Sequence, residues 1–132
     1  MESTLFLKKQ KKNENSRQNI KKGVIMKGPH PLSRVDSYVT RTSPGAYILS
    51  RDGKVAHYVG RSNTDLALRI KNSAKEGLGY KYFWFEHTTS PMQAYYLECE
   101  WWHKYAPPDN DYHPAVPPGT YWRCPVPGCP WS

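Results

Sequence analysis

Four residues stand out for the chemistry of their side chains: Tyr47, Tyr58, Arg69 and Glu98. A guanidinium offers phosphate a two-pronged hydrogen-bonding fork. A carboxylate holds a hard cation such as Mg²⁺ or Mn²⁺, which keeps several waters and bridges to phosphate. Cleaving a phosphodiester requires a positioned nucleophile, cationic charge on the phosphate oxygens and relief of charge on the leaving oxygen. Each residue alone would ordinarily be structural. Together they include the kinds of group that phosphodiester cleavage needs.

A second group of residues has the spacing of metal ligands. Cys99 and His103 are four residues apart and so share one face of a helix, while Cys124 and Cys129 flank a tight turn. This pattern predicts a closed Cys₃His zinc site, with His113 as an alternative ligand. The other interpretations are a buried Cys99 with two unengaged thiols, or a Cys124–Cys129 disulfide, which a reducing compartment disfavours.

Two strand-like runs, 46–50 and 55–60, surround Asp52-Gly53, a strong hairpin signal. A two-residue turn at Asp52-Gly53 would pair residue 47 with residue 58. Tyr47 and Tyr58 would then be directly opposite on one face, with Cβ atoms about 4.5–5.5 Å apart. The two phenols could therefore converge on one ligand.

The remaining elements follow from capping signals and apolar spacing. Residues 63–65 offer N-caps for a helix that carries Arg69, and Ser90-Pro91 begins a helix that runs to about residue 105. On the latter helix, Glu100 should face away from Glu98, because two residues rotate by about 200°. The expected fold class is α/β, with a small three-stranded antiparallel sheet (46–50, 55–60, 80–87). Helices near 32–39, from 66 to about 77, and near 91–105 flank this sheet.

These pieces resemble the GIY-YIG nuclease family. The resemblance covers roughly residues 44–110 and rests on the order of its motifs: Gly45-Ala46-Tyr47, Tyr58-Val59-Gly60, Arg69, Glu98, Tyr105, Pro107 and Asn110. Two positions depart from the family pattern. Ala46 replaces the usual Ile, and Asn72 or Ser73 stands near the place where many members carry a His.

The resemblance implies a metal-dependent endonuclease that acts on nucleic acid, with DNA as the expected substrate. Tyr47 would orient or deprotonate the attacking water, Tyr58 would position phosphate or water, and Glu98 would hold one Mg²⁺ or Mn²⁺. The implied catalytic set is Tyr47, Tyr58, Arg69, Glu98 and Asn110, and Arg61 and Lys71 are expected to contact the nucleic acid. The alternative is a non-catalytic nucleic-acid-binding or zinc-stabilised interaction module with the same fold.

Charge and composition divide the 132 residues into three parts. Residues 1–27 hold seven Lys and one Arg against two Glu, and we expect a mobile basic arm that contacts phosphates without reading bases. Residues 28–132 carry only +2 of the chain's net +8. Within them we expect a nuclease domain over 28–110 and a Pro- and Gly-rich tail, 111–132, pinned by zinc.

The sequence contains no stretch of 18 or more apolar residues and no secretory signal. We therefore expect a cytoplasmic protein without a membrane partner. Three cysteines are an odd number, which argues against a self-contained disulfide framework.

Overall fold

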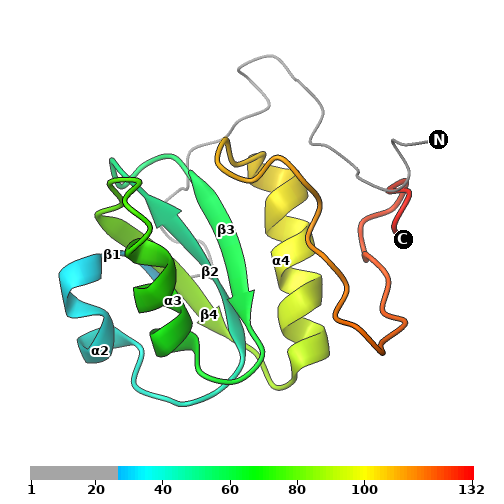
Figure 1. Cartoon of the computed structure of the whole chain (residues 1–132), viewed down its shortest axis with the longest axis horizontal. Helices are drawn as coiled ribbons and strands as arrows, with labels where there is room; N and C mark the ends of the chain where they lie inside the picture. The colour runs from blue at the N-terminus through cyan, green and yellow to red at the C-terminus, as the bar shows by residue number, and fades with distance from the viewer. Residues whose placement is uncertain (1–26) are drawn as a thin grey trace.

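A computed structural model describes residues 27–132 and has the expected α/β class (Figure 1). The basic arm therefore lies outside the described residues, apart from Lys27. The elements, in chain order, are β1 (Lys27–Pro31), η2 (Leu32–Arg34), α2 (Val35–Tyr38), β2 (Gly45–Ser50), β3 (Tyr58–Ser62), α3 (Leu66–Ala74), β4 (Tyr82–His87) and α4 (Pro91–Tyr105).

The sheet has four strands in the order β1-β4-β2-β3, and all neighbouring pairs are antiparallel. The prediction of three strands was wrong because β1 adds to the outer edge of β4. Its sequence, Lys-Gly-Pro-His-Pro, lacks the alternating apolar residues that indicate a strand. Proline is nevertheless compatible with an edge strand, because an N–H group on the outer side of that strand has no neighbouring strand to bind.

The helices cover both faces of the sheet. Odd-numbered residues of β2, such as Tyr47 and Leu49, pack with Leu66 and Ile70 of α3. Even-numbered residues of β2 pack instead with Trp101 and Tyr105 of α4 in a separate part of the core, as the period of two along a strand requires. Figure 1 shows the same sandwich, with α2 and α3 on one side of the sheet and α4 on the other. Every residue of β2 is consequently buried.

The β2–β3 hairpin differs from the predicted register by two residues. Tyr47 pairs with Gly60, and Tyr58 pairs with Leu49. The loop is longer than a two-residue turn because the Asp52 side chain organises it: its Oδ1 accepts hydrogen bonds from the backbone N–H groups of Lys54 and Val55, at 2.8 and 3.0 Å. A shift of two residues preserves the face, so the tyrosines remain neighbours, with ring centroids 6.2 Å apart.

The predicted start and end of α4 are confirmed. The Ser90 side chain accepts a hydrogen bond from the backbone N–H of Gln93, and Pro91 occupies the first helical turn. The helix ends where Ala106 takes a left-handed conformation, directly before Pro107. Beyond it, residues 106–132, which we call the C-terminal segment, contain no helix or strand longer than a single bridge and run back along α4 (Figure 1).

Candidate functional site

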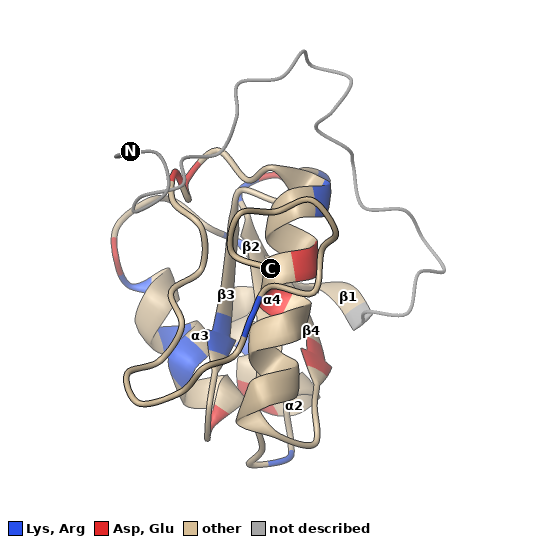
Figure 2. Cartoon of the chain, turned by 90° about the vertical axis from the view of Figure 1, so that its right-hand side faces the viewer, with Lys and Arg blue, Asp and Glu red and all other residues tan. Residues whose placement is uncertain are grey.

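The four residues selected for their chemistry come from β2, β3, α3 and α4. Three of them, Tyr58, Arg69 and Glu98, line one cavity of about 620 Å³ at the outer edge of β3. Polar residues dominate the rest of the lining, which consists of Gly60, Arg61, Ser62, Asn63, Thr64, Asp65, Leu68, Asn72 and Ala115. Figure 2 views the molecule from the side where α3, β3 and α4 lie together, with basic positions on α3 and β3 and acidic positions on α4. The cavity therefore extends around the strand edge, from the α3 face to the α4 face.

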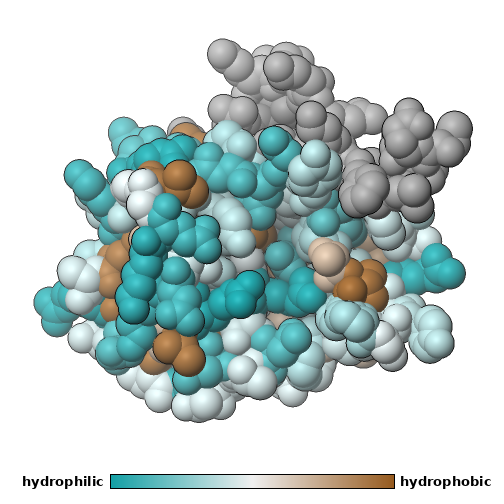
Figure 3. All heavy atoms as spheres, viewed as in Figure 1, coloured by the Kyte–Doolittle hydropathy of each residue, from teal (hydrophilic) through white to brown (hydrophobic). Residues whose placement is uncertain are grey.

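The surface around this region suits a polar ligand. The face shown in Figure 3 is mainly hydrophilic, and its apolar residues lie in small, separated groups. Leu68 is the apolar side chain of the lining with substantial exposure, at 53%.

Tyr47 lies behind Tyr58 and is fully buried. Its hydroxyl is 2.6 Å from Ser73 Oγ of α3, so Ser73, near the position where the family pattern has a His, binds the phenol. Burial raises the pKa of Tyr47 well above its ordinary value, while Ser73 and Arg69 only partly oppose that rise. The phenol is therefore protonated at neutral pH. It can donate a hydrogen bond but is a poor base.

Gly60 makes room for the Tyr47 ring. A Cβ atom at position 60 would lie 2.5 Å from both Cζ and the hydroxyl oxygen of Tyr47. This close approach follows from the observed register, in which Gly60 is the direct partner of Tyr47. The glycine of the second tripeptide motif is thus needed for packing.

Glu98 is a buried carboxylate on α4, with 8% of its surface exposed. Burial raises its pKa, and the neighbouring Arg61 and Arg69 guanidinium groups pull in the opposite direction. By contrast, Glu100 is exposed, which confirms that it faces away from Glu98.

Arg61 and Lys71, which we expected to contact nucleic acid, are each paired with a carboxylate of the chain. Arg61 forms an ion pair with Glu98 and donates to the carbonyl oxygen of Ala115, at 2.5 and 3.0 Å. Lys71 forms an ion pair with Asp36 of α2 at 2.9 Å and is outside the cavity lining. In both cases a carboxylate distant in the sequence provides the partner, which residue spacing alone does not indicate.

Asn110, expected in the catalytic set, does not line the cavity. Its side-chain amide binds the backbone of Val59 on β3 instead: Oδ1 accepts from the Val59 N–H at 2.9 Å, and Nδ2 donates to the Val59 carbonyl at 2.8 Å. Asn110 therefore attaches the C-terminal segment to the outer edge of β3.

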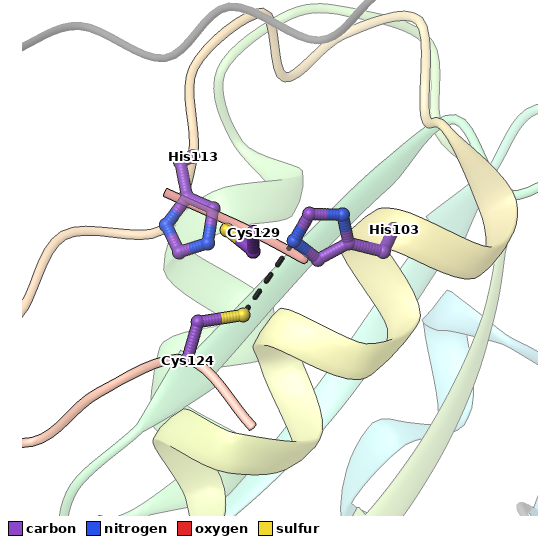
Figure 4. Close-up of side chains that lie close together, drawn as sticks. All are labelled: His103, His113, Cys124 and Cys129. Carbon is purple, nitrogen blue, oxygen red and sulfur yellow. Dashed lines mark hydrogen bonds between the residues drawn. The ribbon is translucent and has the colours of Figure 1, made fainter. Parts of the chain in front are cut away.

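A cysteine and histidine cluster that could hold a metal ion such as zinc lies between α4 and the C-terminal segment. Its members are His103, His113, Cys124 and Cys129, whose ligand atoms all lie within 4.8 Å of one another. Figure 4 shows the four side chains pointing toward a common centre, with Cys124 Sγ 3.5 Å from His103 Nε2. We call this group the Cys/His cluster.

Three of the predicted ligands, His103, Cys124 and Cys129, belong to the cluster, and its fourth member is the alternative ligand His113; the prediction of Cys99 was wrong. Cys99 is fully buried and packs with Tyr95, Cys124 and Cys129 in the core beneath the C-terminal segment. Cys99 lies one helical turn before His103 on α4, but of the two only His103 belongs to the cluster. All three cysteines are free thiols, so the disulfide alternative is also wrong.

His113 has the protonation state of a metal ligand. Its Nδ1 lies 2.9 Å from the Pro114 carbonyl oxygen, which can only accept, so Nδ1 carries the proton and Nε2 the lone pair. Nε2 is buried without a hydrogen-bond partner, and burial lowers the pKa of the ring. A neutral imidazole with its other nitrogen fixed by a carbonyl is the usual arrangement around zinc.

The dimensions of the Cys/His cluster also suit zinc. Zn–S bonds of about 2.3 Å and Zn–N bonds of about 2.0–2.1 Å in a tetrahedron place ligand atoms roughly 3.3–3.8 Å apart. The separation of Cys124 Sγ from His103 Nε2 lies within that range. The other ligand atoms, which lie up to 4.8 Å apart, would move slightly closer together on binding zinc.

Neither a protein-family model nor a curated protein nor a solved structure matches the chain. Within residues 27–132, no helix combines the length and the apolar character that crossing a bilayer requires.

Proposed function

We propose that this protein is a divalent-metal-dependent endonuclease of the GIY-YIG type that hydrolyses phosphodiester bonds in DNA. The supporting observation is the convergence of Tyr58, Arg69 and Glu98 on one cavity, with Tyr47 packed behind Tyr58. These residues are far apart in the sequence and come from separate elements. The combination of a phenol, a guanidinium and a carboxylate around an open cavity matches the needs of phosphoryl chemistry.

The geometry distributes the roles among these residues. Arg69 is exposed at the cavity and can place its fork on phosphate oxygens. Tyr58 borders the same space and can position phosphate or the attacking water. Tyr47 is protonated, so it acts through its hydrogen bonds with Ser73 and its packing on Tyr58, and not as the base. A group other than Tyr47 must then remove the proton from the attacking water.

Glu98 fits the role of the cation ligand. Its carboxylate is buried beside the cavity, and its raised pKa shows that the surrounding positive charge does not fully compensate for burial. A nearby divalent cation would favour the ionised form. When bound there, Mg²⁺ or Mn²⁺ would supply charge neutralisation on the phosphate and a lower pKa for water.

We propose zinc as the occupant of the Cys/His cluster, where it would have a structural role. The four protein ligands leave no position for substrate, which is typical of structural zinc. Elemental analysis of protein purified without chelators should give one zinc per chain. Protein without bound zinc that retains the native C-terminal segment would exclude this role.

One observation favours the non-catalytic alternative. Arg61 is already paired with Glu98, as it would be in a nucleic-acid-binding module that keeps the fold without turnover. The decisive difference between the two functions is therefore whether Glu98 supports turnover.

The test is cleavage of supercoiled plasmid, single-stranded DNA and RNA in Mg²⁺ or Mn²⁺, with EDTA as the reference. Glu98→Gln keeps the shape but removes the charge, so cleavage should fall by several orders of magnitude while substrate binding survives. Glu100→Gln is the matched control, because its side chain lies on the same helix but is exposed, and it should be nearly silent. Full cleavage by Glu98→Gln would refute the mechanism, and binding without any cleavage by the unaltered protein would support the binding module.

A further inference from the structure

Arg61 joins three separate parts of the molecule. One arm of its guanidinium, Nη1, binds Glu98 Oε1 at 2.5 Å, and the other arm, Nη2, binds the carbonyl oxygen of Ala115 at 3.0 Å. The guanidinium carbon also lies 5.2 Å from the centre of the Tyr95 ring. The side chain is largely buried, so these contacts fix its orientation.

This arrangement divides the guanidinium between two acceptors. An arginine beside a carboxylate commonly places two parallel N–H groups on both carboxylate oxygens. Here Ala115 takes the second arm, and Arg61 Nε is buried without a hydrogen-bond partner. Glu98 is therefore bound by one arm only.

The Ala115 carbonyl belongs to the same segment as most of the Cys/His cluster. Ala115 lies between two cluster members in sequence, His113 and Cys124, in a segment without regular secondary structure. His103 joins that cluster from α4, the helix that also carries Glu98. A metal ion bound in the cluster would therefore help to fix where the acceptor of the second arm lies relative to Glu98.

We infer that a metal ion in the Cys/His cluster controls the availability of Glu98 to its own divalent cation, with Arg61 as the positioning residue. When the C-terminal segment is released, Nη2 loses Ala115 and is free to close on Glu98 as a two-pronged pair. That pair covers the oxygens that a hard cation needs. This inference rests on the proposed function, because it assumes that Glu98 binds such a cation.

The experiment measures Mn²⁺ binding to the full chain by electron paramagnetic resonance, with and without zinc in the Cys/His cluster. Glu98→Gln defines the component of binding that depends on Glu98. Loss of zinc, by chelation or by His113→Ala, should weaken that component by about tenfold, the lower end of the effect of removing an outer-shell partner. Cys99→Ala is the matched control, since Cys99 is buried nearby but outside the cluster, and it should retain both zinc and Mn²⁺ affinity.

If the zinc-free chain fails to fold, two substitutions of Arg61 in the zinc-loaded protein test whether Arg61 controls Mn²⁺ binding at Glu98. Arg61→Lys replaces the two-armed guanidinium by a single ammonium group, which cannot bind Glu98 and Ala115 through separate arms. The ammonium can therefore move fully onto Glu98 and weaken Mn²⁺ binding. Arg61→Gln removes the competing charge and should strengthen binding. Unchanged Mn²⁺ affinity in Arg61→Lys would overturn the inference alone. Absence of any Glu98-dependent Mn²⁺ binding would overturn both the inference and the proposed nuclease function.

Discussion

The cavity is lined by side chains from β3, α3 and α4, whereas the Cys/His cluster joins one residue of α4 to three residues of the C-terminal segment. The first region is built on elements that a hydrophobic core already holds together. The second region packs a smaller apolar cluster against α4, to which Val116, Trp122 and Trp131 contribute, and gathers free thiols and imidazoles around a space that suits a cation. The cavity residues are thus positioned by the folded core, whereas we expect the C-terminal segment to need metal ligation in addition to its apolar packing.

Zinc removal should produce the largest effect and should separate the two regions. Structural zinc contributes roughly 10–16 kcal/mol of apparent binding energy in small domains, enough to dock residues 106–132. With a strong chelator, or in Cys124→Ser, we expect rapid proteolysis in the C-terminal segment with most of the far-ultraviolet circular dichroism retained. Cys99→Ser should keep its zinc. Simultaneous loss of all secondary structure would show that the two regions fold as one unit.

Gly60→Ala tests how tightly the cavity wall is packed. The added Cβ would lie 2.5 Å from the Tyr47 ring, which is fully buried and cannot move aside. We expect a loss of about 1–3 kcal/mol in the free energy of unfolding, measured by denaturant titration. The loss should shrink in a Tyr47→Leu background, because the smaller side chain leaves room. An equal loss in both backgrounds would mean that Tyr47 is not the obstacle.

Asn110→Ala tests the junction between the two regions. The substitution leaves the N–H and the carbonyl of Val59 without the amide that now binds both. An unsatisfied group of this kind costs about 1–3 kcal/mol where it is buried, and less where water reaches it. We therefore expect modest destabilisation in thermal melts with zinc content unchanged. A catalytic Asn110 would instead reduce cleavage without any change in stability.

Glu98→Gln should give the smallest change in stability, and in the favourable direction. Burial raises the pKa of Glu98 in the folded state above its value in the unfolded chain. At pH values above the unfolded-state pKa, the Glu98 carboxyl group therefore lowers the free energy of unfolding. In EDTA at pH 7, the variant should be more stable by about 0.5–2 kcal/mol, as is common at functional sites. The gain should vanish as pH falls below the ordinary value of 4.5, where the carboxyl is protonated in both states. A gain that persists at low pH would have a different cause.

Local signals in the sequence accounted for the elements that carry the cavity. The Ser90-Pro91 cap, the helix that bears Arg69 and the aromatic strand β4 all follow from residue types and spacing, and the structure confirms them. These signals suffice because capping and alternation act over a few residues. The register of the hairpin could not be predicted in the same way, since it depends on how the Asp52 side chain binds its loop.

Contacts between distant residues were the features that sequence reasoning missed. Nothing near Arg61 in the sequence points to Glu98 or Ala115, and nothing near Lys71 points to Asp36. The choice between Cys99 and His113 as the fourth member of the cluster, which the sequence left open, depends on how the C-terminal segment turns back along α4, a path that has no periodic pattern in the sequence. The signal that made His113 the alternative ligand was a second imidazole in a segment that already carried two cysteines.

The amide of Asn110 also has a consequence for self-association. β3 is an edge strand, and an exposed row of N–H and C=O groups on such a strand can recruit another chain into a continuous sheet. Here Asn110 takes both backbone groups of Val59, and the Asp109 N–H binds the carbonyl of His57 just before β3. At the opposite edge, β1 contains two prolines, which have no N–H to offer. Both edges of the sheet are therefore protected against intermolecular strand pairing: the β1 edge by its prolines and the β3 edge by the chain's own C-terminal segment.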